Sequence, residues 1–339
     1  MFDESRERGA VLGSARSVKQ IADERAQGRE SGVSPLALDG WLEFNRLKWN
    51  VRPIKIRVPG PDAEPPVAEA VLYLDKSGQV YHPRRNPYLP IRFQPTPTVL
   101  RHRLTRQWLE VAEMLVVELR QRGLKNTLTL PPEVCDIRPW QWAGFQAGIR
   151  YTYFIDLPFN VELTNKGIGT QVRKAEKLGF RCARTTNMSD VMACLRDTET
   201  RQGFSYGLST ADLELASQLL GEEHFRAYVC YAPEGQVASA SVLLHQTGAP
   251  AIGWLGGTRT AYMGDGLNQL VETFIIGDLE AGGASGYDLC GANLPTVAAT
   301  KANWGARLLP YYSIETYSVR RLAKWTLNWW RYLDQGRSG

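Results

Sequence analysis

Residues 286–293 read Gly-Tyr-Asp-Leu-Cys-Gly-Ala-Asn, and residues 300–305 read Thr-Lys-Ala-Asn-Trp-Gly. The pattern predicts a short strand, a tight turn, a helical turn that carries one lysine, and a second strand at 308–312. This lysine, Lys301, has no carboxylate within four positions on either side and lies close to Trp304. A lysine without a local partner can keep its charge for a substrate, and the plain alternative is a solvated surface lysine.

The length and composition predict a globular protein of two domains. A chain of 339 residues exceeds one typical domain, and 43% hydrophobic with 22% charged residues is an ordinary globular composition. No apolar run approaches the roughly 18 residues of a membrane span, and the chain opens with acidic residues, so we expect a cytoplasmic protein without a transmembrane segment. The five cysteines are scattered, without a C-x-x-C pair or a histidine at ligand spacing, so we expect neither disulfides nor a metal site.

The positive charge is concentrated in one segment. Between Arg84 and Lys125 there are nine basic residues and three glutamates, an excess of six, whereas the whole chain has a net charge of +5. This excess suggests a basic face that meets phosphates, and a solvated helix surface is the alternative.

The order of expected elements differs between the two halves. The first half is expected to hold a hairpin at 70–81, a helix at 101–122 ended by Gly123, and strands at 127–130 and 151–157. The second half is expected to hold helices at 163–178, 189–201, 210–220 and 267–280, strands at 180–184, 225–231, 236–245 and 251–257, and then the stretch at 286–312.

This order resembles the acetyltransferase fold of the GNAT superfamily, and more narrowly its tandem FemAB-type branch with the BioF-like acetyltransferase domains. Residues 171–179 resemble the R-x-x-I-R-K-A-x-K-x-G helix of that branch, with Gly169 or Thr170 in place of the first arginine. Residues 286–293 resemble its Y-D-x-x-G-A strand and turn, and residues 300–305 resemble its F-K-x-x-F-G, with threonine and tryptophan for the two aromatic residues.

The resemblance implies an α+β protein with two GNAT-like domains around a central cleft. We expect a peripheral or disordered segment at 1–33, a degenerate N-terminal domain at 40–162, a C-terminal domain at 163–315, and a C-terminal helix and tail rich in tryptophan and arginine at 316–339. The implied activity is an acyltransferase that forms an amide, by moving an activated acyl or aminoacyl group onto an amine, without a metal or a bound cofactor.

The reaction needs an amine that has lost its proton and a group that stabilises the oxyanion. The resemblance assigns the lysine of F-K-x-x-F-G to the reacting centre, which is Lys301 here, as a stabiliser of charge. Asp136, before a proline turn, is the candidate for accepting the proton of the amine, and a turn cap is the alternative.

The donor is expected at a glycine loop and a basic helix. Gly264 and Gly266 precede the helix at 267–280 and suit phosphate binding, and a plain helix-initiating turn is the alternative. Arg173 and Lys174 can hold a phosphate of tRNA, coenzyme A or a nucleotide-linked acceptor, and a solvated helix face is the alternative. The loop lacks the Q/R of typical acyl-CoA users, which with the basic segment favours aminoacyl-tRNA; acyl-CoA, with a small amine or amino-sugar acceptor, is the rival.

The acceptor is expected to be a small amine, and no DNA partner is expected. The residues proposed for its pocket are Tyr206, Trp304, Asn293 and Trp142.

Two further hypotheses come from other functional classes. One is a hydrolase, because residues 203–207 match G-x-S-x-G, although a helix rather than a strand is expected before them. The other is a non-catalytic module that binds a phosphorylated ligand in the cleft.

Overall fold

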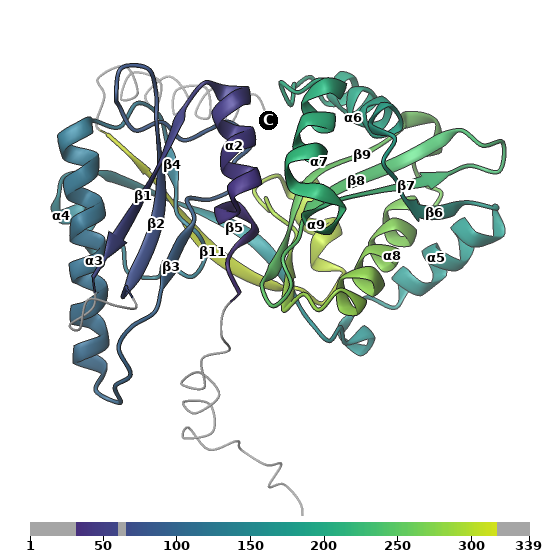
Figure 1. Cartoon of the computed structure of the whole chain (residues 1–339). Coiled ribbons are helices and arrows are strands. Elements are labelled where there is room, and N and C mark those ends of the chain that lie inside the picture. Colours follow the sequence, from purple (N-terminus) through teal and green to yellow (C-terminus); the bar gives the residue numbers. More distant parts are fainter. Residues whose placement is uncertain (1–31, 60–65, 317–339) are drawn as a thin grey trace, which may run out of the picture.

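The computed structural model describes residues 32–59 and 66–316, so the structure says nothing of the tryptophan-rich tail or of residues 1–31. Two β-sheets organise the described chain (Figure 1). One has three strands and lies in the first half, and the other has eight strands and runs through both halves. The α+β class expected from the sequence is confirmed.

The smaller sheet has the order β1-β2-β3 and the larger the order β4-β11-β5-β10-β9-β8-β7-β6. The strands are β1 Arg52–Val58, β2 Ala68–Leu74, β3 Ile91–Phe93, β4 Leu128–Thr129, β5 Gln146–Asp156, β6 Arg181–Arg184, β7 Phe225–Tyr231, β8 Val237–Leu244, β9 Pro250–Thr258, β10 Gly286–Asp288 and β11 Arg307–Glu315. The helices are η1 Pro35–Ala37, α2 Asp39–Trp49, α3 Arg101–Arg122, α4 Arg138–Trp142, η2 Val161–Leu163, α5 Gly167–Lys177, α6 Met188–Gln202, α7 Thr210–His224, η3 Thr260–Tyr262, α8 Leu267–Ala281 and α9 Pro295–Ala302.

Helix α3 forms over the predicted residues and closes the first-half core. Its buried residues, Val111, Leu115 and Leu119 among them, recur with the helical period. Gly123 ends the helix with a φ of 77°, a conformation that glycine adopts without strain. The core that α3 shares with β2 also contains Ile314, from the last strand of the described chain.

In the second half, helices cover both faces of the sheet. Alternate residues of β7 point to opposite faces: Ala227 and Val229 pack with α6 and α7, whereas Tyr228 packs with α8. Figure 1 shows strands β6 to β9 between these two helical layers, with α5 lying beside α8. Helix α7 begins with a capping box, because Ser209 and Asp212 cap each other's backbone N–H groups.

Strand β10 is short and leaves its neighbour early. It pairs in parallel with β9 only from Gly286 to Asp288, opposite residues 250–252, and beyond them β9 continues to Thr258 paired with β8 alone. On its other side β10 pairs antiparallel with β5. The sheet is therefore open beyond Asp288, in the middle of the molecule.

Some elements differ from the expectation. Helix α2 and strand β1 were not predicted. The hairpin expected at 70–81 forms only in part. Its second arm makes a single antiparallel bridge, between Val80 and Leu74, and Val80 also makes a parallel bridge with Leu124. Strand β5 begins five residues before the expected start at residue 151. The added residues pair with β11, which is bonded to β5 over residues 146–154.

Candidate active site

The turn that follows β10 is held by Lys301. The ammonium of this lysine donates to the carbonyl oxygens of Leu289 at 2.7 Å and Gly291 at 2.9 Å, and also to that of Cys290. Cys290 has a φ of 48°, the left-handed conformation that side chains rarely adopt. All three N–H groups of Lys301 are engaged, so a reacting oxygen would have to displace one of these carbonyls.

Burial lowers the pKa of Lys301, and the nearby Cys290, Glu272 and Asp288 counteract this. Nothing in the local sequence indicated such a shift. Glu272, on α8, is desolvated, which raises its pKa to about 7, although a hydrogen bond with Tyr287 and the charge of Lys301 oppose the rise. One oxygen of Glu272 has no hydrogen-bond partner among the described residues.

Asp288 faces the other side of the sheet. Its carboxylate accepts hydrogen bonds from the Thr152 hydroxyl at 2.5 Å, the Tyr88 hydroxyl at 2.9 Å and the Cys290 backbone N–H at 2.8 Å. Desolvation nevertheless raises the pKa of Asp288, because the side chain is buried. Tyr88 belongs to the first half, so this contact joins the two halves.

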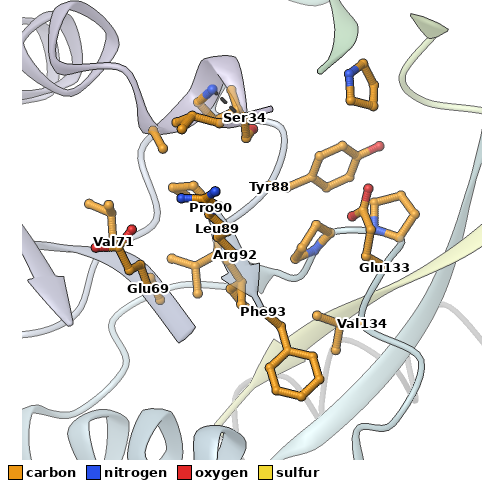
Figure 2. A pocket seen from close by; sticks show the side chains of 18 of the residues that line it. Ser34, Glu69, Val71, Tyr88, Leu89, Pro90, Arg92, Phe93, Glu133 and Val134 are labelled. Carbon is orange, nitrogen blue, oxygen red and sulfur yellow. Dashed lines mark hydrogen bonds between the residues drawn. The ribbon is translucent and has the colours of Figure 1, made fainter. Parts of the chain in front are cut away.

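A cavity of about 660 Å³ opens beside Asp288 (Figure 2). The three-stranded sheet, the loop at 131–136 and the central strands all contribute to its walls. Most of the lining is apolar: Val71, Leu89, Phe93, Trp108, Val134, Phe154, Ile252 and Leu309. The volume is that of a small-molecule site. The cavity lies between the two halves, where the central cleft was expected.

Glu133 is the acidic residue of this cavity that the sequence reasoning missed. It follows Pro131 and Pro132, and Figure 2 shows it on the same side of the cavity as Tyr88. Glu133 as a whole residue is exposed, but protein atoms crowd around its carboxyl and raise its pKa, and the charge of Asp288 adds to the rise. The double proline after β4 was the available signal, since it directs the chain out of the sheet at that point.

Asp136, the base predicted from the sequence, lines the edge of the same cavity. Its carboxylate accepts from the Arg138 guanidinium at 2.8 and 2.7 Å and from the Arg138 backbone N–H. These hydrogen bonds lower the pKa of Asp136. The contacts fit a turn cap at the start of α4, and the role as a base stays a prediction.

The predicted donor residues lie together, away from the cavity lining. Lys174 donates to the carbonyl of Gly264 at 2.7 Å and lies 3.5 Å from Asp265. Gly266 begins α8, and a Cβ there would lie 2.2 Å from the Gln171 carbonyl, so α5 covers the start of α8 closely. Arg173 is exposed on α5.

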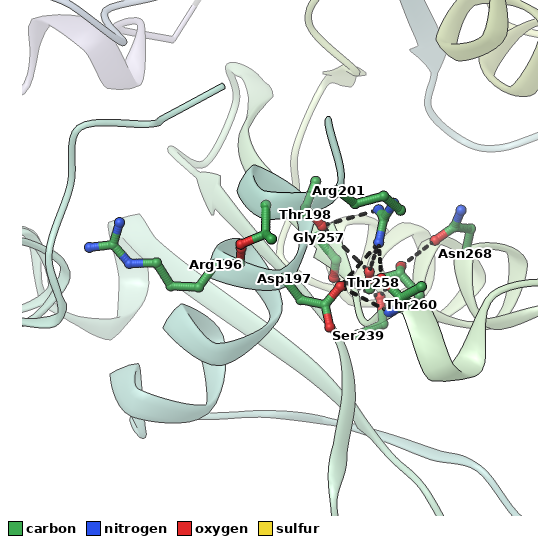
Figure 3. A network of polar contacts seen from close by, with 10 residues as sticks. Arg196, Asp197, Thr198, Arg201, Ser239, Gly257, Thr258, Thr260 and Asn268 are labelled. Carbon is green, nitrogen blue, oxygen red and sulfur yellow. Dashed lines mark hydrogen bonds and ion pairs between the residues drawn. The ribbon is translucent and has the colours of Figure 1, made fainter. Parts of the chain in front are cut away.

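A polar network fixes the start of this glycine loop (Figure 3). Arg201, on α6, donates to the Thr258 carbonyl at 2.9 Å and to the Thr260 hydroxyl at 3.1 Å. The Asp197 carboxylate accepts from Thr260, and the Thr258 hydroxyl donates to Asn268 on α8 at 2.7 Å. The loop is therefore tied to α6 and α8 where β9 ends.

The four residues predicted for the acceptor pocket are scattered, and none of them lines the cavity. The Tyr206 hydroxyl donates to the Gly256 carbonyl at 2.8 Å, and Trp304 is buried against Phe159. Asn293 bonds to the backbone of Tyr151. Trp142 is exposed beside Arg138.

The G-x-S-x-G match lies in a loop after α6, as expected. Ser205 donates to Glu199 at 3.0 Å, and a helix rather than a strand precedes it, so the strand-to-helix elbow of a hydrolase is not formed.

Several cations of the basic segment 84–125 bind protein groups. Arg85 donates to the Tyr206 carbonyl at 3.0 Å, Arg122 pairs with Glu118, and Lys125 pairs with Asp75.

In residues 32–59 and 66–316, no group of three or more histidine, cysteine and acidic side chains is placed to hold a metal ion. No described helix is long and apolar enough to cross a membrane.

No protein-family model matches the sequence, and neither does any curated protein. The structure is similar to a crystal structure of FemX, with a TM-score of 0.59 and 15% identity over 86% of this chain and 95% of that one. It is also similar to L-PGS from Bacillus licheniformis, with a TM-score of 0.52 and 11% identity over 83% and 89% of the chains. A third similar structure is a conserved protein of unknown function from Bacteroides thetaiotaomicron, with a TM-score of 0.52 and 9% identity over 85% of this chain and 93% of that one.

These likenesses show the fold. The chain has a fold similar to that of FemX, in agreement with the FemAB-type resemblance of its sequence motifs.

Proposed function

From a FemX-like fold whose two halves enclose a cavity, we propose that this chain is an N-acyltransferase that joins an activated acyl or aminoacyl group to an amine. The observation that carries the proposal is the pair Glu133 and Asp288. These two carboxyls, one from each half, face one cavity and both have raised pKa values. A base whose pKa is raised towards neutrality is better suited to take a proton from an ammonium group.

The cavity and the open sheet give the two reactants different approaches. The amine lies in the cavity, and Glu133 accepts its proton. The acyl carbonyl comes from the α8 side, where β9 and β10 separate next to the turn held by Lys301. The amine nitrogen attacks the carbonyl carbon and forms the C–N bond. The bond to the leaving oxygen or sulfur then breaks, and the leaving atom takes up the proton that the attacking nitrogen releases as the amide forms.

The glycine loop supports aminoacyl-tRNA as the donor. Coenzyme A would need the start of α8 to be open to its pyrophosphate, but α5 covers Gly266 and Lys174 binds the carbonyl of Gly264. The exposed cations of α5, Arg173 and Lys177, suit the phosphates of a larger ligand.

Acyl-CoA is the second candidate donor. One observation favours it: the space around Gly264 is open, since a Cβ there would meet nothing within 4 Å. A thioester could therefore reach the loop from the solvent side.

A thermal-unfolding comparison separates the donors. We expect aminoacyl-tRNA to raise the unfolding temperature, with a steep loss of protection between 50 and ~200 mM salt. Uncharged tRNA and coenzyme A are the controls. Protection by acetyl-CoA alone would overturn the tRNA assignment, and ligand binding without turnover by any donor would indicate a binding module instead of an enzyme.

A further inference from the structure

One wall of the cavity is a row of charged residues on the three-stranded sheet. Arg57 on β1, Glu69 on β2 and Arg92 on β3 are direct partners across the strands. They therefore lie side by side on one face of the sheet, and all three line the cavity. The Arg57 guanidinium lies 3.1 Å from the Glu69 carboxylate.

This wall carries an excess of positive charge. Lys55, Arg57 and Arg92 line it together with a single acidic residue of the sheet, Glu69. Lys55 pairs with Asp39, whose side chain is 88% exposed, so water screens that pair. The Nε atom of Arg92 is buried and has no hydrogen-bond partner among the described residues. An arginine whose guanidinium is not neutralised by the protein keeps its charge for a bound anion.

The opposite wall carries the acids. Figure 2 shows Glu69 and Val71 on one side of the cavity, and Tyr88, Glu133 and Val134 on the other. The space between these walls is lined by aromatic and aliphatic side chains. A ligand that spans the cavity thus meets cations at one end, apolar groups in the middle and carboxyls at the other end.

We propose that the acceptor is an amino carboxylate: a molecule with an amine, an apolar body and a carboxylate. The carboxylate binds Arg92 on the β3 wall, and the amine faces Glu133 and Asp288. This assignment rests on the proposed function, and the product would be an N-acyl or N-aminoacyl derivative of that acid. A guanidinium fork matches a carboxylate through two parallel hydrogen bonds.

Binding without donor tests the assignment directly. L-Phenylalanine has an amine and a carboxylate, phenethylamine lacks the carboxylate, and 3-phenylpropionate lacks the amine; 8-aminooctanoate, octylamine and octanoate form a longer set. By calorimetry we expect the parent of at least one set to bind about 10- to 100-fold more tightly than either of its truncated partners. Equal affinity of parent and amine in both sets would overturn the proposal.

Variants locate the carboxylate. Arg92→Gln should weaken binding of the parent amino carboxylate by about 10- to 100-fold and leave the affinity for the amine unchanged. Arg92→Lys, which keeps the charge, should recover part of the lost affinity. Glu69→Gln should strengthen binding of the parent amino carboxylate, because the wall loses its negative charge. Arg46→Gln is the matched control, since Arg46 is exposed on α2 and outside the cavity lining. An equal loss in the Arg46 variant would overturn the assignment to Arg92.

The result is distinguishable from a failure of the proposed function. Tight binding of the amino carboxylate without turnover would leave the binding site in place and remove the transferase. Efficient acylation of phenethylamine or octylamine, with no gain in rate from a carboxylate, would support the transferase and overturn the amino-carboxylate assignment. Tighter binding of the phosphonate analogue of phenylalanine than of phenylalanine would assign the wall to phosphate instead of carboxylate and overturn the proposal.

Discussion

At the scale of single residues, Glu133 and Asp136 show how position within one loop sets chemistry. Both are acidic residues that line the same cavity. The Arg138 guanidinium lowers the pKa of Asp136, whereas desolvation and the charge of Asp288 raise that of Glu133. The sequence places an arginine two residues after Asp136, but it does not reveal that protein atoms around the Glu133 carboxyl raise its pKa. For that reason Asp136 could be proposed from the sequence and Glu133 could not.

Glu133→Gln should lower kcat by about 100-fold or more, because the amine loses its proton acceptor. The wild-type rate should fall on acidification, through a pKa above the usual carboxyl value of 4.5, and the variant should lack this limb. Rates from pH 5 to 9 measure both effects. Asp136→Asn is the comparison, and a larger loss there than at Glu133 would return the base to the residue proposed from the sequence.

Lys301→Met should destabilise the protein by about 2 to 4 kcal/mol, since three backbone carbonyls lose a charged donor. Urea unfolding measures the loss, and kcat is measured in parallel below the unfolding transition. Loss of kcat with full stability would support direct contact with the reacting atoms. Full activity with reduced stability would limit Lys301 to holding the turn.

At the scale of elements, the sequence predicts most of the second half. Strand β7 has the predicted bounds, 225–231, and α6, α8 and β9 begin and end within a residue or so of the expected positions. These elements have a strong apolar period and clear glycine or polar ends. Strand β1 was missed although Ile54, Ile56 and Val58 alternate with charged residues, so its signal was present in the sequence. Helix α2 begins without a side-chain cap.

Helix α8 carries a carboxyl whose protonation should be visible in stability. The pKa of Glu272 rises from 4.5 to about 7 on folding. Its contribution is therefore fully present below pH 4.5 and is lost as the pH rises to 7. Glu272→Gln should raise the free energy of unfolding at pH 8 by up to about 3 kcal/mol and change it little at pH 4.

Denaturant unfolding at the two pH values tests this prediction. Glu214→Gln, at an exposed position of α7, is the control and should show no such difference. Equal effects of Glu272→Gln at pH 4 and pH 8 would show that folding does not shift the pKa of Glu272.

At the scale of the whole molecule, the two halves share one sheet. Strand β11, the last described strand, pairs with β5 and β4 and places Ile314 in the first-half core. The order of elements along the chain suggested two copies of one fold, but it does not state which strands pair across them. The cavity depends on that pairing, because its walls come from both halves, and so its lining could not be read from the sequence.

The contact between Tyr88 and Asp288 tests how strongly the halves depend on each other. Tyr88→Phe keeps the ring, which packs on Tyr311 with centroids 5.2 Å apart, and removes the hydroxyl that donates to Asp288. A desolvated carboxylate oxygen then lacks its donor, which should cost about 1 to 3 kcal/mol at pH 8.

The pH dependence of this loss follows from the sign of the shift. The pKa of Asp288 is already raised on folding, so its contribution to stability is present below the unfolded value and declines as pH rises through the folded one. Removing the hydroxyl raises that pKa further, and the loss should be larger at pH 8 than at pH 4. Tyr231→Phe is the control, because its bond to Asp190 lies wholly within the second half. A loss from Tyr88→Phe that is the same at both pH values would show that the Tyr88 hydroxyl stabilises the protonated and the ionised forms of Asp288 equally, and would contradict the prediction.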